Sequence, residues 1–214
     1  MPASLHKVSD SAIRRLSIYL RVLGGLEREG KETVSSQVLA DRAGTTAAQV
    51  RKDLSLFGSF GKRGLGYLVT TLRDELRGIL GVSRTWRVAL VGIGRMGAAL
   101  LEYPHFRARG FEFVAVYDSD PEKVGSRRGM LTVEDARVLE ESLRETGVEI
   151  VVLTVPAGAA QEVADAAVRA GVRGIMNFAP VALKVPPGVR VNAVRLTVEL
   201  EVLSFSLGSV ADRE

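Results

Sequence analysis

The chain of 214 residues is 46% hydrophobic and 25% charged, a composition that excludes disordered and collagen-like proteins and predicts a medium domain with a small companion. The absence of cysteine excludes disulfides, thiolate metal sites and cysteine nucleophiles, and two histidines are too few for a histidine cage, so we expect no metal. The net charge of +4 is uneven: residues 1–82 hold 13 Lys+Arg against 8 Asp+Glu, and residues 83–214 hold 16 against 17.

The basic excess of the first third is typical of a segment that binds a polyanion, although charge scattered over a solvated surface gives the same count. Residues 1–10 lack the basic start and apolar run of a signal peptide. No stretch approaches the roughly 20 apolar residues that span a bilayer. We therefore expect a cytoplasmic protein without a membrane partner.

Three helices are predicted first in chain order. Apolar residues recur at helical spacing over residues 11–30, and Ser35 or Ser36 can cap a short second helix over residues 37–42. A capping box at Thr46 opens a third helix, in which Ala47, Val50, Leu54 and Phe57 share an apolar face. That face leaves small, amide and basic side chains pointing elsewhere: Ala48, Gln49, Arg51, Lys52 and Ser55.

Those outward side chains are the ones that a DNA recognition helix needs. Ala48 permits close approach, Gln49 can pair with an adenine edge, and a basic side chain such as Lys52 can reach guanine or phosphate. Any three-helix domain can show this pattern by chance. The next segment favours the DNA-binding interpretation, because glycines and aromatics in residues 58–67 predict a β-hairpin with Lys62-Arg63 at its tip, which is typical of a wing.

A further helix follows with Thr71-x-x-Asp74 at its start, and residues 81–85 form a linker. A glycine-rich surface loop would explain the glycines of residues 58–67 but not their basic tip. We therefore predict a winged-helix DNA-binding domain over residues 1–81. The expected DNA contacts are Ser35, Ser36, Thr46, Ala48, Gln49, Arg51, Lys52, Lys62, Arg63 and Tyr67.

A glycine-rich motif marks the second predicted domain, residues 82–193. A buried strand from Arg87 runs into Gly92-x-Gly94-x-x-Gly97 and then into a helical pattern, which is the context of a dinucleotide-binding turn. Gly92 allows the tight turn, Gly94 lets a pyrophosphate approach the backbone, and Gly97 lets the helix pack on the strand. The helix N-terminus favours the negative charge of the phosphates.

The next strand, Phe113–Asp118, ends in a carboxylate 21 residues after Gly97. An acid at this position accepts ribose hydroxyls and disfavours a 2′-phosphate, so NADH and NAD⁺ are favoured over their phosphorylated forms. Arg127 and Arg128 could receive such a phosphate, although basic residues on a polar loop are more often only solvated.

Strands and helices continue to alternate, with strands over residues 149–154 and 174–177, which predicts an α/β Rossmann-type doubly wound parallel sheet. Ligands bind such sheets at the carboxyl ends of the strands. The expected dinucleotide contacts are Gly92, Ile93, Gly94, Arg95, Met96, Gly97, Asp118, Thr154, Val155, Pro156, Asn177, Phe178, Ala179 and Pro180. No histidine or lysine stands where it would serve as a catalytic acid or base, so a sensor is favoured over an enzyme.

The last segment, residues 194–214, is apolar around most of a helix, with Leu196, Leu200, Leu203 and Leu207 reinforced by Phe205. Such a helix must be buried, either on its own sheet or in a partner subunit. A winged helix usually reads paired half-sites as a dimer, which favours the partner and a dimerisation helix.

Several longer motifs occur in the same order as in one known family. They are Ala48-Gln-Val-Arg-Lys-Asp-Leu54, Phe57-Gly-Ser-Phe-Gly-x-Arg-Gly-x-Gly-Tyr67, Asp118-x-Asp-Pro-x-Lys-Val-Gly125, Thr154-Val-Pro156, Ala160-Gln161 and Asn177-Phe-Ala-Pro180. In these motifs the chain resembles the Rex family of redox-sensing transcriptional repressors over essentially its full length.

The resemblance implies a homodimer with C-terminal helices exchanged between subunits, bound to an inverted-repeat operator in double-stranded DNA. It implies that NADH releases the DNA and that NAD⁺ competes for the same site. Arg21 and Tyr103 match family residues associated with the redox switch. Arg195 stands where the family usually has an aspartate that pairs with them, so we expect sensing to survive with altered coupling, either through Glu199 or through subunit rotation alone.

Two other functional classes compete with the redox repressor. An NAD-dependent oxidoreductase with an N-terminal appendage is disfavoured because acid and base residues are lacking. A CoA- or nucleotide-binding module is the second alternative, since this subtype of Rossmann domain resembles CoA-binding domains. Competition of CoA with NADH would support that alternative.

Overall fold

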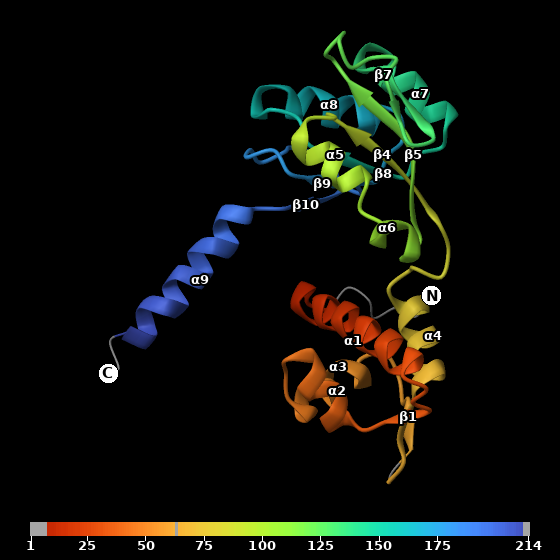
Figure 1. Ribbon diagram of the computed structural model, residues 1–214, viewed down its shortest axis with the longest axis vertical. Coiled ribbons are helices and arrows are strands. Elements are labelled where there is room, and N and C mark those ends of the chain that lie inside the picture. The colour runs from red at the N-terminus through yellow and green to blue at the C-terminus, as the bar shows by residue number, and fades with distance from the viewer. Residues whose placement is uncertain (1–7, 63, 212–214) are drawn as a thin grey trace. The chain divides into compact units, whose positions relative to one another are not determined.

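The computed structural model describes residues 8–62 and 64–211 (Figure 1). The chain divides into two compact units, residues 1–84 and 85–214, within the predicted linker. Arg63, predicted at the tip of the wing, lies outside the described residues. The described residues contain no helix that is both long enough and apolar enough to cross a membrane.

The first unit packs helices against a small antiparallel sheet. The strands are ordered β1-β3-β2. The elements are α1 (Asp10–Arg28), β1 (Thr33–Val34), α2 (Ser36–Ala43), α3 (Ala47–Ser55), β2 (Gly61–Lys62), β3 (Gly66–Leu68) and α4 (Val69–Ile79). The three predicted helices and the predicted hairpin are therefore present, the hairpin as β2 and β3.

Side-chain caps and one apolar core define this unit. Ser35 Oγ accepts the N–H of Val38 at the start of α2, and Gly44 ends that helix with a φ of 68°. The core joins all four helices through fully buried side chains: Leu16, Tyr19, Leu23, Leu39, Val50, Leu72 and Leu76. The predicted start of the fourth helix at Thr71 is wrong, because α4 begins at Val69 without a side-chain cap.

The second unit is built on a seven-stranded sheet with the order β10-β9-β8-β4-β5-β7-β6. All neighbours are parallel except β6 and β7. The strands are β4 (Trp86–Val91), β5 (Phe111–Asp118), β6 (Arg127–Arg128), β7 (Leu131–Asp135), β8 (Ile150–Leu153), β9 (Gly174–Asn177) and β10 (Arg190–Ala193). The predicted doubly wound α/β sheet is confirmed.

Helices cover both faces of this sheet (Figure 1). They are α5 (Arg95–Leu101), α6 (His105–Ala108), the 3₁₀ helix η2 (Ala136–Val138), α7 (Leu139–Glu145) and α8 (Ala157–Arg169). Alternate strand residues face α7 and α8 on one side, as Val91 does, and α5 on the other, as Leu90 does. From β4 the chain builds the sheet outward in one direction, and from β8 it builds the sheet outward in the other direction. Between two such strands, a crevice forms at their carboxyl ends.

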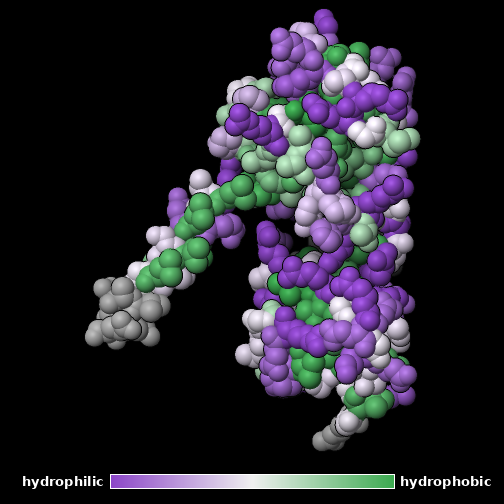
Figure 2. All heavy atoms as spheres, in the orientation of Figure 1, coloured by the Kyte–Doolittle hydropathy of each residue, from purple (hydrophilic) through white to green (hydrophobic). Residues whose placement is uncertain are grey.

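The last helix, α9 (Leu196–Ala211), leaves its apolar side chains uncovered within the chain. Leu200 is 66% exposed and Phe205 is 78% exposed, and Figure 2 shows the hydrophobic surface of this helix. The alternative in which the helix covers its own sheet is therefore wrong. Seven large apolar side chains of α9 are exposed to solvent: Leu196, Val198, Leu200, Val202, Leu203, Phe205 and Leu207.

Candidate functional site

The first candidate site is a basic surface where α3 meets the β2–β3 hairpin. Ala48, Arg51, Lys52 and Ser55 of α3 are exposed, as predicted for a recognition helix. Arg51 Nη1 donates to Ser36 Oγ at 2.9 Å, which fixes the guanidinium beside α2. A hollow of about 450 Å³ joins these elements, and its lining includes Ser35, Ser36, Arg51, Ser55 and Lys62.

Three residues predicted to contact DNA make contacts within the protein. Thr46 Oγ1 caps α3 by accepting the N–H of Gln49, but the Gln49 side chain does not return the bond, so only half of the capping box forms. Gln49 is instead half-buried, with its amide bound to Asp53. Tyr67 is 9% exposed and belongs to the core, where its ring lies beside the backbone of Gly61, and it also lines the hollow.

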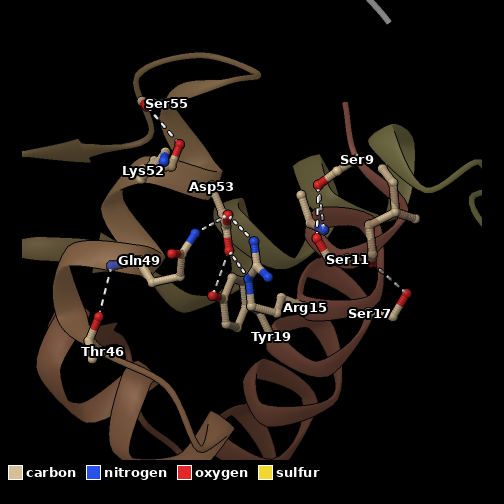
Figure 3. Close-up of polar contacts among 12 residues, drawn as sticks. Ser9, Ser11, Arg15, Ser17, Tyr19, Thr46, Gln49, Lys52, Asp53 and Ser55 are labelled. Atoms are coloured by element: carbon tan, nitrogen blue, oxygen red, sulfur yellow. Dashed lines mark hydrogen bonds and ion pairs between the residues drawn. The ribbon is translucent and has the colours of Figure 1, made fainter. Parts of the chain in front are cut away.

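Asp53 is a buried charged residue of this unit that sequence reasoning missed (Figure 3). Its carboxylate accepts from Arg15 Nε at 2.6 Å, Arg15 Nη2 at 2.7 Å, Tyr19 Oη at 2.9 Å and Gln49 Nε2 at 2.7 Å. Burial by itself raises the pKa of the Asp53 carboxyl, but these donors outweigh burial and hold that pKa below its ordinary value. The only signal in the sequence is a charged residue beside Leu54 on the inward side of the helix.

The same network predicts that the folded protein loses stability at alkaline pH. Burial, and then the hydrogen bond to Asp53, raise the pKa of Tyr19 from 10.0 to about 12. The pKa of Tyr19 is higher in the folded protein than in the unfolded chain, so the protonated hydroxyl contributes to the free energy of unfolding. This contribution, about 2–3 kcal/mol, is complete below about pH 10 and is lost as the pH rises through 12. Urea unfolding of the full chain at pH 8 and pH 11.5 measures that loss.

The matched variant is Tyr19→Phe, which keeps the buried ring and removes the titrating hydroxyl. We expect its unfolding free energy to fall less between the two pH values than that of the wild type. A residual fall remains, because burial also raises the pKa of Tyr67 and of Tyr117. Equal losses in both proteins would contradict this account of Tyr19.

The second candidate site is a cleft of about 1240 Å³ at the carboxyl ends of the strands of the second unit. Eight predicted dinucleotide contacts line it: Gly92, Gly94, Met96, Asp118, Thr154, Val155, Pro156 and Phe178. Its lining also includes residues that were not predicted, among them Ser119, Asp120, Lys123, Asp135, Arg137, Glu162 and Arg169. The motif that begins at Asp118 contains the signal for Ser119, Asp120 and Lys123. The others come from elements distant in sequence. Arg127 and Arg128 lie on β6 and are not part of the lining.

The three glycines of the motif occupy different environments. Gly92 has a φ of 93°, and a Cβ there would lie 2.8 Å from the carbonyl oxygen of Thr154. A Cβ on Gly97 would collide with the carbonyl oxygen of Gly92. A Cβ on Gly94 meets no atom within 4 Å, so the backbone at Gly94 faces open space. These observations confirm the tight turn and the close helix packing, and they leave Gly94 free for approach by a ligand.

Asp118 holds the floor of the cleft together. It is 8% exposed, its Oδ2 accepts the N–H of Ile93 at 2.8 Å, and its Oδ1 accepts the N–H of Asp120 at 2.9 Å. Lys123 Nζ lies 3.4 Å from Oδ2. A carboxylate has about four acceptor positions, so capacity remains for a hydroxyl group. The open Gly94, this carboxylate and the volume of the cleft fit a dinucleotide.

The remaining predicted contacts do not line the cleft, and several shape its walls instead. Ile93 donates its N–H to Asp118. Asn177 is fully buried, donates to Val181 O at 2.8 Å and accepts the N–H of Ala179 at 2.9 Å, so it closes the turn that follows β9. The others that do not line the cleft are Arg95, Gly97, Ala179 and Pro180.

The three residues that the resemblance associates with the switch belong to different elements. Arg21 is exposed on α1. Tyr103 is 51% exposed, with its ring edge-to-face against His105 and Phe106 at centroid distances of 5.0 and 5.4 Å. Arg195 Nη1 donates to the carbonyl oxygen of Ala179 at 2.8 Å, which ties the start of α9 to the turn that carries Phe178. Among residues 8–62 and 64–211, no group of three or more acidic or histidine side chains is arranged to hold a metal.

Comparisons with known proteins agree with both sites. Residues 7–55 match the family described as putative DNA-binding protein N-terminus, and residues 83–181 match the CoA binding domain family. A protein of Carboxydothermus hydrogenoformans named redox-sensing transcriptional repressor Rex is 49% identical over 94% of this chain and 97% of its own. The protein of that name in Thermus thermophilus is 48% identical over 94% of each chain.

Solved structures agree with this likeness over the whole chain. A crystal structure of RSP in complex with β-NAD⁺ and operator DNA has a TM-score of 0.89 and 36% identity, covering 95% of this chain and 94% of that one. RSP in complex with β-NADH has a TM-score of 0.87 and 34% identity, covering 96% of each chain. The relatives are named as repressors and not as oxidoreductases. The chain belongs to the Rex family of redox-sensing transcriptional repressors.

Proposed function

We propose that this chain represses transcription as a cytoplasmic homodimer that binds an inverted-repeat operator, that NADH releases the DNA, and that NAD⁺ competes for the same cleft. The observation that carries the proposal is the match over 95% of the chain to RSP, which crystallised with β-NAD⁺ and operator DNA and also with β-NADH. The basic α3 surface and the glycine-lined cleft are the two sites that such a protein requires.

On the DNA side, the exposed cations of α3 supply phosphate contacts and Ala48 allows the helix to approach the major groove. Arg51 and Lys52 lie on the outer face of α3, and Lys62 lies on the wing. The caps at Ser35 and Thr46 fix the helix starts that border the DNA.

Lys52→Ala tests this surface. Loss of one phosphate contact weakens binding about equally for all sequences and lowers the slope of log affinity against log salt by about 1. Fluorescence anisotropy of a labelled duplex at several salt concentrations measures the slope. Lys31→Ala is the control, because Lys31 is an exposed lysine outside α3 and the wing. Equal slopes for Lys52→Ala and the wild type would remove Lys52 from the interface.

On the dinucleotide side, the backbone at Gly94 would receive the pyrophosphate and Asp118 a ribose hydroxyl. The bound dinucleotide supplies the redox signal, because its nicotinamide is cationic in NAD⁺ and neutral in NADH. Met96, Val155 and Phe178 give the cleft an apolar part that suits the neutral ring. The dimer would have two arrangements, one that spaces the two recognition helices for successive major grooves and another that NADH prefers. NADH can release DNA only by the difference between its affinities for these two arrangements.

Arg195 gives the coupling between cleft and dimer a specific test. Its hydrogen bond to Ala179 links α9 to the turn beside Phe178, so Arg195→Asp removes this link and reverses a charge. We expect the NADH concentration for half-release of DNA to shift by about 2- to 30-fold. Arg190→Asp makes the same charge change on exposed β10 and is the control. An unchanged concentration in Arg195→Asp would mean that Arg195 is not part of the switch.

The match to the CoA binding domain family favours one second candidate, a cleft that binds CoA. NADH fluorescence on titration into the full chain, repeated with NAD⁺ and with CoA as competitors, separates the two. We expect saturable NADH binding that NAD⁺ reverses and CoA does not. Displacement by CoA alone would support the CoA alternative, and an absence of NADH binding would contradict the proposed function.

A further inference from the structure

The orientation of the Gln49 side chain on α3 depends on Asp53, a buried residue of the same helix. Asp53 is 1% exposed, and the two donors from α1, Arg15 and Tyr19, occupy both of its oxygens. Its fourth bond comes from Gln49, one turn earlier on α3. Because α1 holds the carboxylate in place, Asp53 is a fixed acceptor to which the Gln49 amide must adapt.

The chemistry of the pair determines which end of the Gln49 amide turns outward. An ionised carboxylate accepts hydrogen bonds and donates none, so Gln49 can meet Asp53 only through its nitrogen. Figure 3 shows the amide nitrogen turned toward Asp53 and the amide oxygen turned away. Gln49 therefore presents an acceptor, its Oε1, on the side away from Asp53.

The four bases differ in whether they offer a hydrogen-bond donor to Gln49 Oε1. In the major groove, adenine N6 and cytosine N4 offer donors, whereas guanine O6 and thymine O4 offer only acceptors. A free glutamine turns its amide over and serves both classes. A glutamine held through one of its two N–H groups keeps its amide in one orientation, with Oε1 on the side away from Asp53. In that orientation Oε1 can accept from an amino base, whereas a keto base brings its own oxygen against Oε1.

We propose that Asp53 is a positioning residue for sequence specificity, which makes Gln49 select adenine or cytosine over guanine or thymine at one position of each half-site. This assignment rests on the proposed function, since it requires α3 to enter the major groove. It differs from a purely structural role for Asp53, because a structural role affects stability but not the choice of base.

The test uses the full chain and an operator selected from a random inverted-repeat library. Each position of the half-site is replaced by every base, and affinities are measured by anisotropy. Gln49→Ala identifies the position where the preference depends on Gln49. There we expect the wild type to prefer an amino base by about tenfold. In Asp53→Asn, an N–H group can face Gln49, the amide is no longer held, and we expect this preference to disappear.

Tyr19→Phe is the matched control, because it removes one bond to Asp53 and leaves the bond from Gln49. It should lower stability and keep the base preference. A preference retained in Asp53→Asn would overturn the proposal. So would a Gln49-dependent preference for guanine or thymine in the wild type, a result that does not require Asp53→Asn to fold. Absence of operator binding by the wild type would instead contradict the proposed function itself.

Discussion

Replacing Gly97 by alanine is expected to weaken NADH binding by about 5- to 150-fold while operator binding persists. The added Cβ would collide with the carbonyl oxygen of Gly92 and lie 2.9 Å from Thr154 Oγ1. Neither neighbour can yield easily, because Thr154 Oγ1 itself donates to Gly92 O at 2.6 Å. Overpacking of this kind costs about 1–3 kcal/mol, which is about 5- to 150-fold in a binding constant when the cost falls on the bound state. NADH fluorescence and operator anisotropy measure the two activities.

Two other glycines provide the comparison for Gly97→Ala. Gly94→Ala adds a methyl group to open space, so it should leave the fold intact and weaken NADH alone. Gly158→Ala, at a helical position without neighbours within 4 Å, should change neither activity. Normal NADH affinity in Gly97→Ala would contradict the assignment of this turn as the dinucleotide site.

The double substitution Leu200→Asp with Phe205→Asp is expected to convert the proposed dimer to monomers. Both side chains are more than half exposed in the single chain, and an apolar surface of this extent is typical of a subunit interface. A dimer binds both half-sites of the operator at once, whereas a monomer binds only one. Operator affinity should therefore fall by about 10²- to 10⁴-fold. Sedimentation velocity gives the mass, and anisotropy gives the affinity.

Glu201→Gln changes the charge of the same helix without removing an apolar contact and serves as the control for that pair. NADH binding should survive in the double variant, since the cleft-lining residues lie outside α9. A double variant that remains dimeric and binds the operator normally would show that α9 is not the interface.

Local periodicity and glycine spacing predicted most of the elements. The strand–turn–helix at Gly92–Gly97 follows from the motif, and the φ of Gly92 and the packing of Gly97 agree with the roles inferred from it. Strands β7 and β10 were not predicted, because their short sequences, Leu131–Asp135 and Arg190–Ala193, carry too many polar residues to resemble buried strands.

The details of the sites depend on partners far apart in sequence. Asp53 meets Arg15 and Tyr19 from 38 and 34 residues away, and no local pattern predicts that pairing. Tyr67 lies on a strand where successive residues face opposite sides, and only the tertiary structure shows that its ring faces the core. Asn177 was predicted to contact the dinucleotide because it ends a strand, yet its side-chain amide forms hydrogen bonds to the backbone of the turn that follows.

NADH, and not NAD⁺, is expected to release this protein from DNA. The measurement is fluorescence anisotropy of a labelled inverted-repeat operator bound by the full chain at fixed salt, titrated with NADH and separately with NAD⁺. We expect that NADH lowers the anisotropy to that of free DNA, that NAD⁺ alone does not, and that added NAD⁺ raises the NADH concentration required. Tight binding that is indifferent to both dinucleotides would contradict this expectation.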